Sequence, residues 1–179
     1  MFDHRRKVAD TLLALALLSI SAVRPVRVHA QTADTAAEGS IPTVVIEDGT
    51  VAAAVVRAAV GAQRRLDKPT CARVLDDFRD GAGRTLRSVL ADIALPVTAA
   101  MTRVIFRDGR DLPTCRQSMV IAFTGPGSRV VFVCGNRFGS FSRDATERLI
   151  IHELLHTLGL GERPPTPTEI DLAVSRRCS

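Results

Sequence analysis

The chain has 179 residues, enough for one domain with a substantial hydrophobic core. Its 24 Lys and Arg residues outnumber 19 Asp and Glu residues, but no basic run is flanked by aromatic residues, and Trp and Tyr are absent. This composition does not favour a nucleic-acid-binding protein, so we expect no nucleic-acid partner.

Residues 1–30 have the pattern of a secretory signal peptide. Basic residues 5–7 precede an apolar run over residues 12–23, which is too short to span a bilayer comfortably because about 20 residues are needed. Val28 and Ala30 then occupy the two positions that signal peptidase recognises. We expect cleavage after Ala30 and a secreted or periplasmic protein with no stable membrane anchor. Removing five basic and two acidic residues leaves 19 and 17 in the mature chain.

Residues 31–41 are interpreted as a flexible leader, and residues 42–179 as a single domain. The first part of this domain contains both helical and strand patterns. Strands are predicted over 43–47 and 101–107, and helices over 51–66, 71–78 and 86–95.

The clearest hairpin signal lies in residues 118–134. Two apolar stretches flank the turn sequence Gly-Pro-Gly-Ser. A four-residue loop places Thr124 opposite Arg129, and Met119 opposite Cys134. In this register six residues share one face, as a half-buried sheet requires; they are Met119, Ile121, Phe123, Val130, Phe132 and Cys134.

Two capped helices complete the domain. Asp144 and Glu147 predict the start of a helix that runs to about residue 158, and Thr166 with Glu169 predicts the start of a last helix that ends near residue 178. The predicted fold class is α+β. A small, mainly antiparallel sheet carries helices on one face, and the helix over residues 144–158 packs behind the hairpin.

The mature chain contains four cysteines, and an even number in an exported protein favours two disulfides. The hairpin register places Cys115 four residues beyond the cross-strand position of Cys134. At about 3.3 Å per residue this offset is ~13 Å, too far for a disulfide unless the chain folds back sharply. A last helix that returns over the hairpin would bring Cys178 to Cys134. The predicted pairs are therefore Cys71–Cys115 and Cys134–Cys178.

The helix over residues 144–158 carries the residues that suggest chemistry. His152 and His156, the only histidines of the mature chain, lie on one helix face and can meet one ion at about 2.0–2.1 Å. Glu153 lies beside them and can take a proton from a water whose pKa a zinc ion lowers to about 7. The alternative is a pair of core histidines bonded to backbone carbonyls, with Glu153 in an ion pair.

The sequence His152-Glu-Leu-Leu-His156-Thr-Leu-Gly-Leu-Gly-Glu162 resembles the zincin signature HExxH. It is also similar to the longer metzincin form HExxHxxGxxH up to its last letter. The resemblance implies that His152 and His156 are zinc ligands, that Glu153 is the general base and that Glu162 is the third ligand. In that family the glycine at the position of Gly159 ends the helix and turns the last ligand towards the metal.

Two features depart from the metzincin pattern. No methionine follows Met119 to form a Met-turn, and only 17 residues follow Glu162, too few for a full C-terminal subdomain. Glu169 is the rival third ligand, because zincins of the gluzincin type take a glutamate from the next helix. Thr166 offers Glu169 another role, as the partner in a helix cap.

The favoured function is zinc-dependent hydrolysis of peptide bonds in a peptide or protein substrate, with one zinc ion as cofactor. A second interpretation keeps the metal but changes the substrate to a non-peptide amide or ester. A third is an exported binding or scaffold protein that retains a zincin-like helix without activity. With no tyrosine and no third histidine in the mature chain, zinc, an arginine or backbone N–H groups would have to stabilise an oxyanion.

Overall fold

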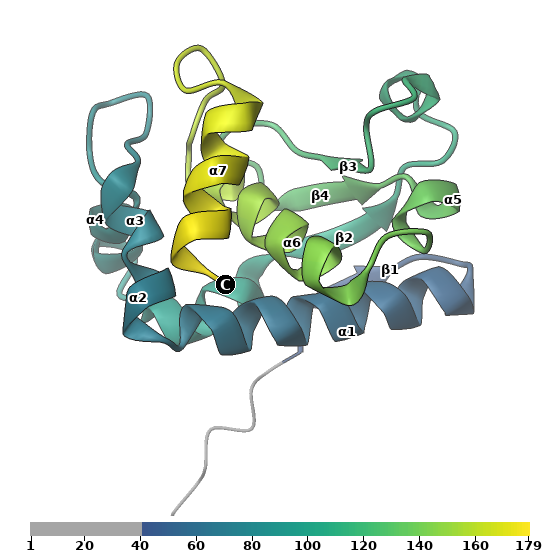
Figure 1. Cartoon of the computed structure of the whole chain (residues 1–179), viewed down its shortest axis with the longest axis horizontal. Helices are drawn as coiled ribbons and strands as arrows, with labels where there is room; N and C mark the ends of the chain where they lie inside the picture. Colours follow the sequence, from purple (N-terminus) through teal and green to yellow (C-terminus); the bar gives the residue numbers. More distant parts are fainter. Residues whose placement is uncertain (1–40) are drawn as a thin grey trace, which may run out of the picture. The chain divides into compact units, whose positions relative to one another are not determined.

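The computed structural model describes residues 41–179 (Figure 1), which belong to one compact unit. The predicted signal peptide and, except for Ile41, the predicted leader lie outside the described residues. No helix in the described part of the chain is long and apolar enough to cross a membrane. The elements, in chain order, are β1 (Thr43–Val45), α1 (Gly49–Leu66), α2 (Pro69–Ala72), α3 (Val74–Asp77), α4 (Leu86–Asp92), the 3-10 helix η1 (Val97–Arg103), β2 (Ile105–Asp108), the 3-10 helix η2 (Pro113–Arg116), β3 (Ala122–Phe123), β4 (Val130–Val133), α5 (Gly135–Phe138), α6 (Arg143–Thr157) and α7 (Pro167–Arg177).

The α+β class is confirmed, but the prediction of a mainly antiparallel sheet is wrong. The four strands have the order β1-β2-β4-β3. β2 pairs in parallel with both β1 and β4, and only β3 and β4 are antiparallel. The physical reason lies in the connections. Parallel pairing needs a crossover of about a dozen residues or more, and the helical segment between β1 and β2 supplies one.

The predicted hairpin exists, but its register and its buried face differ from the prediction. Phe123 pairs with Phe132, two residues away from the predicted register, and their rings stack at 5.3 Å. Val131 and Val133 are fully buried, whereas Met119 is 87% exposed. The sequence of β4 is Val-Val-Phe-Val, so both of its faces are apolar and alternation alone does not identify the inner one.

Helices α1 and α6 lie side by side next to the sheet (Figure 1). Alanines on the buried face of α1 allow the two helices to approach closely. The core joins both helices to the inner face of the sheet; its fully buried members include Phe106, Val131, Val133, Ile150, Ile151, Leu154 and Leu155. This core fixes the position of α6, the helix with the predicted metal ligands.

Both predicted disulfide pairs are wrong, although all four cysteines are bonded. The observed pairs are Cys71–Cys178 and Cys115–Cys134, with Cα separations of 4.4 and 5.3 Å. β3 has only two residues, and before it the chain leaves the sheet and folds back through η2, which returns Cys115 to Cys134. α7 packs against α2 and α3 instead of returning over the hairpin, so its end lies beside Cys71.

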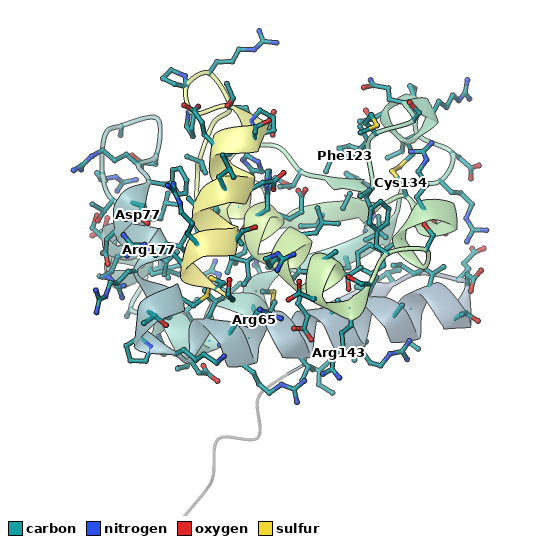
Figure 2. All side chains as sticks on the ribbon, in the orientation of Figure 1. Arg65, Asp77, Phe123, Cys134, Arg143 and Arg177 are labelled. Carbon is teal, nitrogen blue, oxygen red and sulfur yellow. A yellow bond between two sulfur atoms is a disulfide. The ribbon has the colours of Figure 1, made fainter. Side chains whose placement is uncertain are left out.

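A cluster of ion pairs joins α1 to α6 (Figure 2). The Glu147 carboxylate, 8% exposed, accepts hydrogen bonds at 2.8 Å from Arg65 Nε and from Arg143 Nε. Gly61 leaves room for it, because a Cβ at that position would lie 2.0 Å from Glu147 Oε1. Burial acts to raise the pKa of Glu147, but the two guanidinium groups outweigh burial and hold this pKa below its ordinary value of 4.5.

We expect Glu147→Gln to lower the free energy of unfolding by about 1–3 kcal/mol at pH 7, because the buried carboxylate that accepts from Arg65 and Arg143 loses its charge, while Asp144 remains a partner of the part-buried Arg65. Because folding lowers the pKa of Glu147, its stabilisation is present above pH 4.5 and is lost as the pH falls through the folded-state value. The difference between parent and variant should therefore shrink at pH 3. Urea unfolding at both pH values measures it. Asp144→Asn is the control, since Asp144 is a half-exposed partner of Arg65 and should cost at most about 1 kcal/mol.

Candidate metal centre

Local residues determine where helix α6 begins and ends. Ser142 Oγ accepts a hydrogen bond from the Ala145 amide, so the helix cap lies two residues before the predicted Asp144. Gly159 has a φ of 104°, a left-handed conformation that glycine adopts without strain, and it ends the helix as predicted. Between these ends His152, Glu153 and His156 are buried.

Hydrogen bonds from the Nδ1 atoms orient both histidine rings. His152 Nδ1 donates to Asp171 Oδ1 at 2.7 Å, and His156 Nδ1 donates to the carbonyl oxygen of Leu160 at 2.8 Å. A neutral imidazole that donates through Nδ1 keeps the lone pair of Nε2 free for a metal ion. The two rings, with centroids 4.8 Å apart, are thus fixed in the tautomer that a metal site requires.

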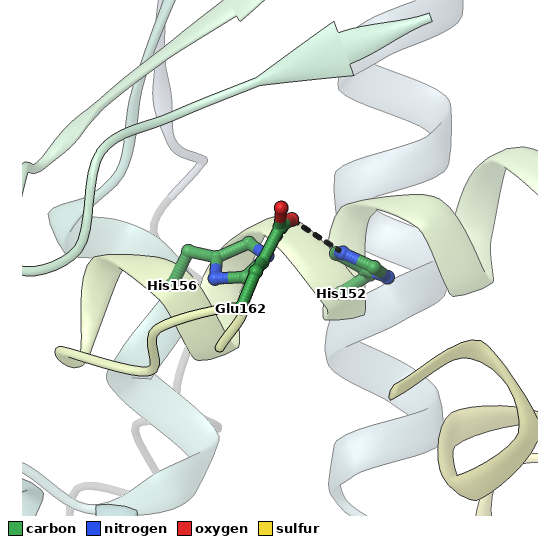
Figure 3. A group of neighbouring side chains, drawn as sticks. All are labelled: His152, His156 and Glu162. Atoms are coloured by element: carbon green, nitrogen blue, oxygen red, sulfur yellow. Dashed lines mark ion pairs between the residues drawn. The ribbon is translucent and has the colours of Figure 1, made fainter. Parts of the chain in front are cut away.

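The free Nε2 atoms face the Glu162 carboxylate, which arrives from the turn after α6 (Figure 3). Glu162 Oε1 lies 3.1 Å from His156 Nε2 and 3.9 Å from His152 Nε2. Tetrahedral ligands with bonds of about 2.0–2.1 Å are separated by roughly 3.4 Å, so these distances lie on either side of the expected value. His152, His156 and Glu162 therefore form a group that could hold a metal ion.

Glu153 is buried beside this group without a hydrogen-bond partner for its Oε2 atom. Burial raises the pKa of Glu153 to about 7, and the neighbouring charge of His152 opposes this rise. Of the alternative interpretation, a histidine bonded to a backbone carbonyl occurs at His156, but the ion pairs of the described residues include none with Glu153. A buried carboxyl group with a pKa near neutrality is suited to accepting and returning a proton.

The histidines also have shifted pKa values. Burial lowers the pKa of His156. Burial acts in the same direction on His152, but the hydrogen bond to Asp171 and the nearby carboxylates outweigh it, so the pKa of His152 is raised.

The residues present fit a metal ion better than a closed polar core. His156 Nε2 and Glu153 Oε2 are both buried and lack a hydrogen bond of acceptable geometry, although His156 Nε2 lies within ion-pair distance of Glu162. An unsatisfied buried polar atom costs about 1–3 kcal/mol. A cation between the two histidines and Glu162 would remove the cost at His156. Glu153 Oε2 would remain free to bind water.

Glu169, the rival third ligand, does not reach the histidines. Its carboxylate accepts hydrogen bonds from the amide and hydroxyl of Thr166 at 2.8 and 2.9 Å, which completes the predicted capping box of α7. Among the described residues, the group of potential ligands contains Glu162 and not Glu169. The Glu169 carboxylate cannot cap α7 and bind the metal at the same time, and in the structure it caps the helix.

The sequence did not predict Asp171 as the partner of His152, and for His156 it offered a backbone carbonyl only as an alternative, without naming the residue. Asp171 lies 19 residues after His152 on α7, in no spacing relation to the HELLH segment. The other partner is the main-chain carbonyl of Leu160, and a carbonyl has no sequence signature. The only sequence feature that could have indicated Asp171 is its place as a carboxylate on the helix after the motif. Glu169 has the same feature, so it does not distinguish the two residues.

The candidate centre opens into a cavity of about 770 Å³. One wall is α6 with its histidines and Glu153, and the opposite wall is the edge strand β3 with the segment before it. The hairpin turn is joined to the end of the helix, because the Gly127 amide donates to the His156 carbonyl at 2.8 Å. The size and position of the cavity suit a small substrate or a segment of a larger one.

A scan against protein-family models, a search of curated proteins and a search of solved structures each give no match.

We expect Asp171→Asn to lower metal affinity by about 10–100-fold, the usual effect of removing a carboxylate that orients a ligand histidine. The side-chain oxygen of an asparagine accepts a hydrogen bond from His152 Nδ1 more weakly than a carboxylate does. It also carries no negative charge to stabilise a cation bound at His152 Nε2. Titration with Zn²⁺ in a competing chelator measures the change. The control is Asp76→Asn, a half-exposed aspartate paired with Arg87 away from the cavity. Equal affinities of parent and Asp171→Asn would show that the His152–Asp171 bond is only structural.

Proposed function

We propose that this chain is an exported zinc-dependent metallopeptidase of a zincin-like type. The observation that carries the proposal is the convergence of two oriented histidine Nε2 atoms and the Glu162 carboxylate beside an unpaired buried Glu153. Its export rests on the signal-like sequence of residues 1–30 and on two disulfides, which are typical of proteins in oxidising compartments.

Two imidazole nitrogens and one carboxylate are a donor set that suits zinc, so His152, His156 and Glu162 would hold the ion at the wall of the cavity. When bound there, zinc would polarise the substrate carbonyl and lower the pKa of the attacking water to about 7. Glu153 Oε2 takes the proton from that water and returns it to the leaving amine. Glu153 is buried beside the candidate ligands with its Oε2 atom unpaired, so this carboxylate is free to serve as the proton acceptor.

The strand beside the centre favours a peptide as substrate. The Cys134 amide donates to the Ile121 carbonyl, so in the antiparallel alternation the next residue, Ala122, directs its own N–H and C=O groups to the open edge of the sheet. Ala122 lines the cavity together with both histidines. An extended peptide can form main-chain hydrogen bonds with such an edge, whereas a small ester or amide cannot use it fully.

The test is the metal content of the purified mature chain together with digestion of casein. We expect about one zinc ion per chain and proteolysis that a chelator abolishes and added zinc restores. Bound zinc with hydrolysis of small esters or amides, but not of casein, would support the non-peptide alternative. Bound zinc without any hydrolysis would support the inactive scaffold. A chain that binds no divalent metal would exclude both hydrolase interpretations.

A further inference from the structure

The cavity wall that faces α6 is formed by residues 115–121, which comprise the end of η2 and the irregular stretch between η2 and β3. Met119, Val120 and Ile121 from this segment line the cavity. It has little regular structure, since its own backbone bonds are single turns such as that from the Val120 amide to the Gln117 carbonyl. Among the described backbone hydrogen bonds, one ties the segment to another element, from the Cys134 amide to Ile121. Its position must therefore come from other contacts.

Arg137 on α5 supplies these contacts. Its Nη1 atom donates to the carbonyl oxygens of Gln117 and Val120 at 2.6 and 2.5 Å, and its Nη2 atom donates to that of Cys115 at 2.6 Å. One guanidinium group thus holds three carbonyls of the same segment. The Cys115–Cys134 disulfide (Figure 2 labels Cys134) ties the start of this segment to the residue that precedes α5.

We infer that Arg137 is a positioning residue that sets the substrate affinity of the cavity. It lies outside the cavity lining, and it acts by fixing the wall that Met119 and Val120 form and the edge strand that follows. The candidate metal ligands come from α6 and the turn after it, and none of the three hydrogen bonds that the Arg137 guanidinium donates goes to these elements. Its loss should therefore affect binding more than chemistry. This inference rests on the proposed peptidase function.

Arg137→Lys is the informative change, because a lysine keeps the charge but is a single compact donor group that does not reproduce the planar fork. We expect KM for a fluorogenic peptide cleaved by the parent to rise about tenfold with kcat nearly unchanged, the pattern of lost ground-state binding. Zinc affinity should not change. In hydrogen exchange, amides of residues 115–122 should exchange faster than in the parent, while those of α6 keep their protection.

The matched control is Arg87→Lys. Arg87 also donates to a backbone carbonyl, that of Ala72 at 2.7 Å, and pairs with Asp76, but it is remote from the cavity lining. It should leave KM and the exchange of residues 115–122 unchanged.

Unchanged KM and unchanged exchange in Arg137→Lys would overturn the inference. So would loss of zinc affinity or of protection throughout the domain, since Arg137 would then stabilise the fold in general. If the parent binds zinc but cleaves no peptide, the proposed function fails by itself. The exchange of residues 115–122 then still decides whether Arg137 holds the wall.

Discussion

Replacement of Glu153 by Gln is expected to lower the rate of peptide hydrolysis by about 10²–10⁴-fold, the usual contribution of a general acid–base group. The amide has nearly the same shape as the carboxyl group but does not accept a proton. Because the candidate ligands are His152, His156 and Glu162, the zinc content should remain that of the parent. Steady-state kinetics with a peptide substrate and metal analysis of the same preparation give both values.

The same variant has a second signature in the metal-free chain. Burial raises the pKa of Glu153, so between its ordinary value of 4.5 and about 7 the folded state binds more protons than the unfolded state, and its stability falls as the pH rises. Glu153→Gln removes this cost and should be more stable than the parent at pH 8. Asp76→Asn is the control for activity, because it replaces a half-exposed carboxylate that lies away from the cavity. Parent-like activity of Glu153→Gln would exclude Glu153 as the base.

The two glutamates after the helix should differ sharply when each is changed to alanine. Glu162→Ala removes one of three ligand groups, so the loss of zinc affinity should exceed the about 10–100-fold expected for an orienting residue such as Asp171. Glu169→Ala removes a helix cap of α7 and should cost about 0.5–2 kcal/mol of stability with little change in zinc affinity. Zinc titration and thermal unfolding of both variants separate the two effects.

Each variant is thus the control for the other. Loss of zinc affinity in Glu169→Ala with normal affinity in Glu162→Ala would assign the third ligand to α7. The capping box of Thr166 and Glu169 would then have to open when the metal binds. Equal, small losses in both variants would leave two histidines as the only protein ligands.

Local sequence determined the candidate centre to a large extent. The i, i+4 spacing places His152 and His156 on one helix face, because the helix has 3.6 residues per turn, and the structure keeps that geometry. Gly159 ends the helix, and three residues later Glu162 reaches the histidines, as the resemblance to the metzincin motif implied. The capping box of Thr166 and Glu169 was equally local and was found as predicted.

Contacts between distant segments were decided only by the tertiary structure. β4 is apolar on both faces, so its inner face, its parallel partner and the hairpin register depend on which helices cover the sheet. The disulfide pairs follow from the fold-back at η2 and from the packing of α7 against α2 and α3. No periodic pattern of residues in the sequence marks either feature. Asp171 and Arg137 depend on the same packing. The sequence by itself therefore determined the candidate ligands on and just after one helix, since a few backbone turns relate them. The tertiary structure decided which residues orient and enclose these candidate ligands.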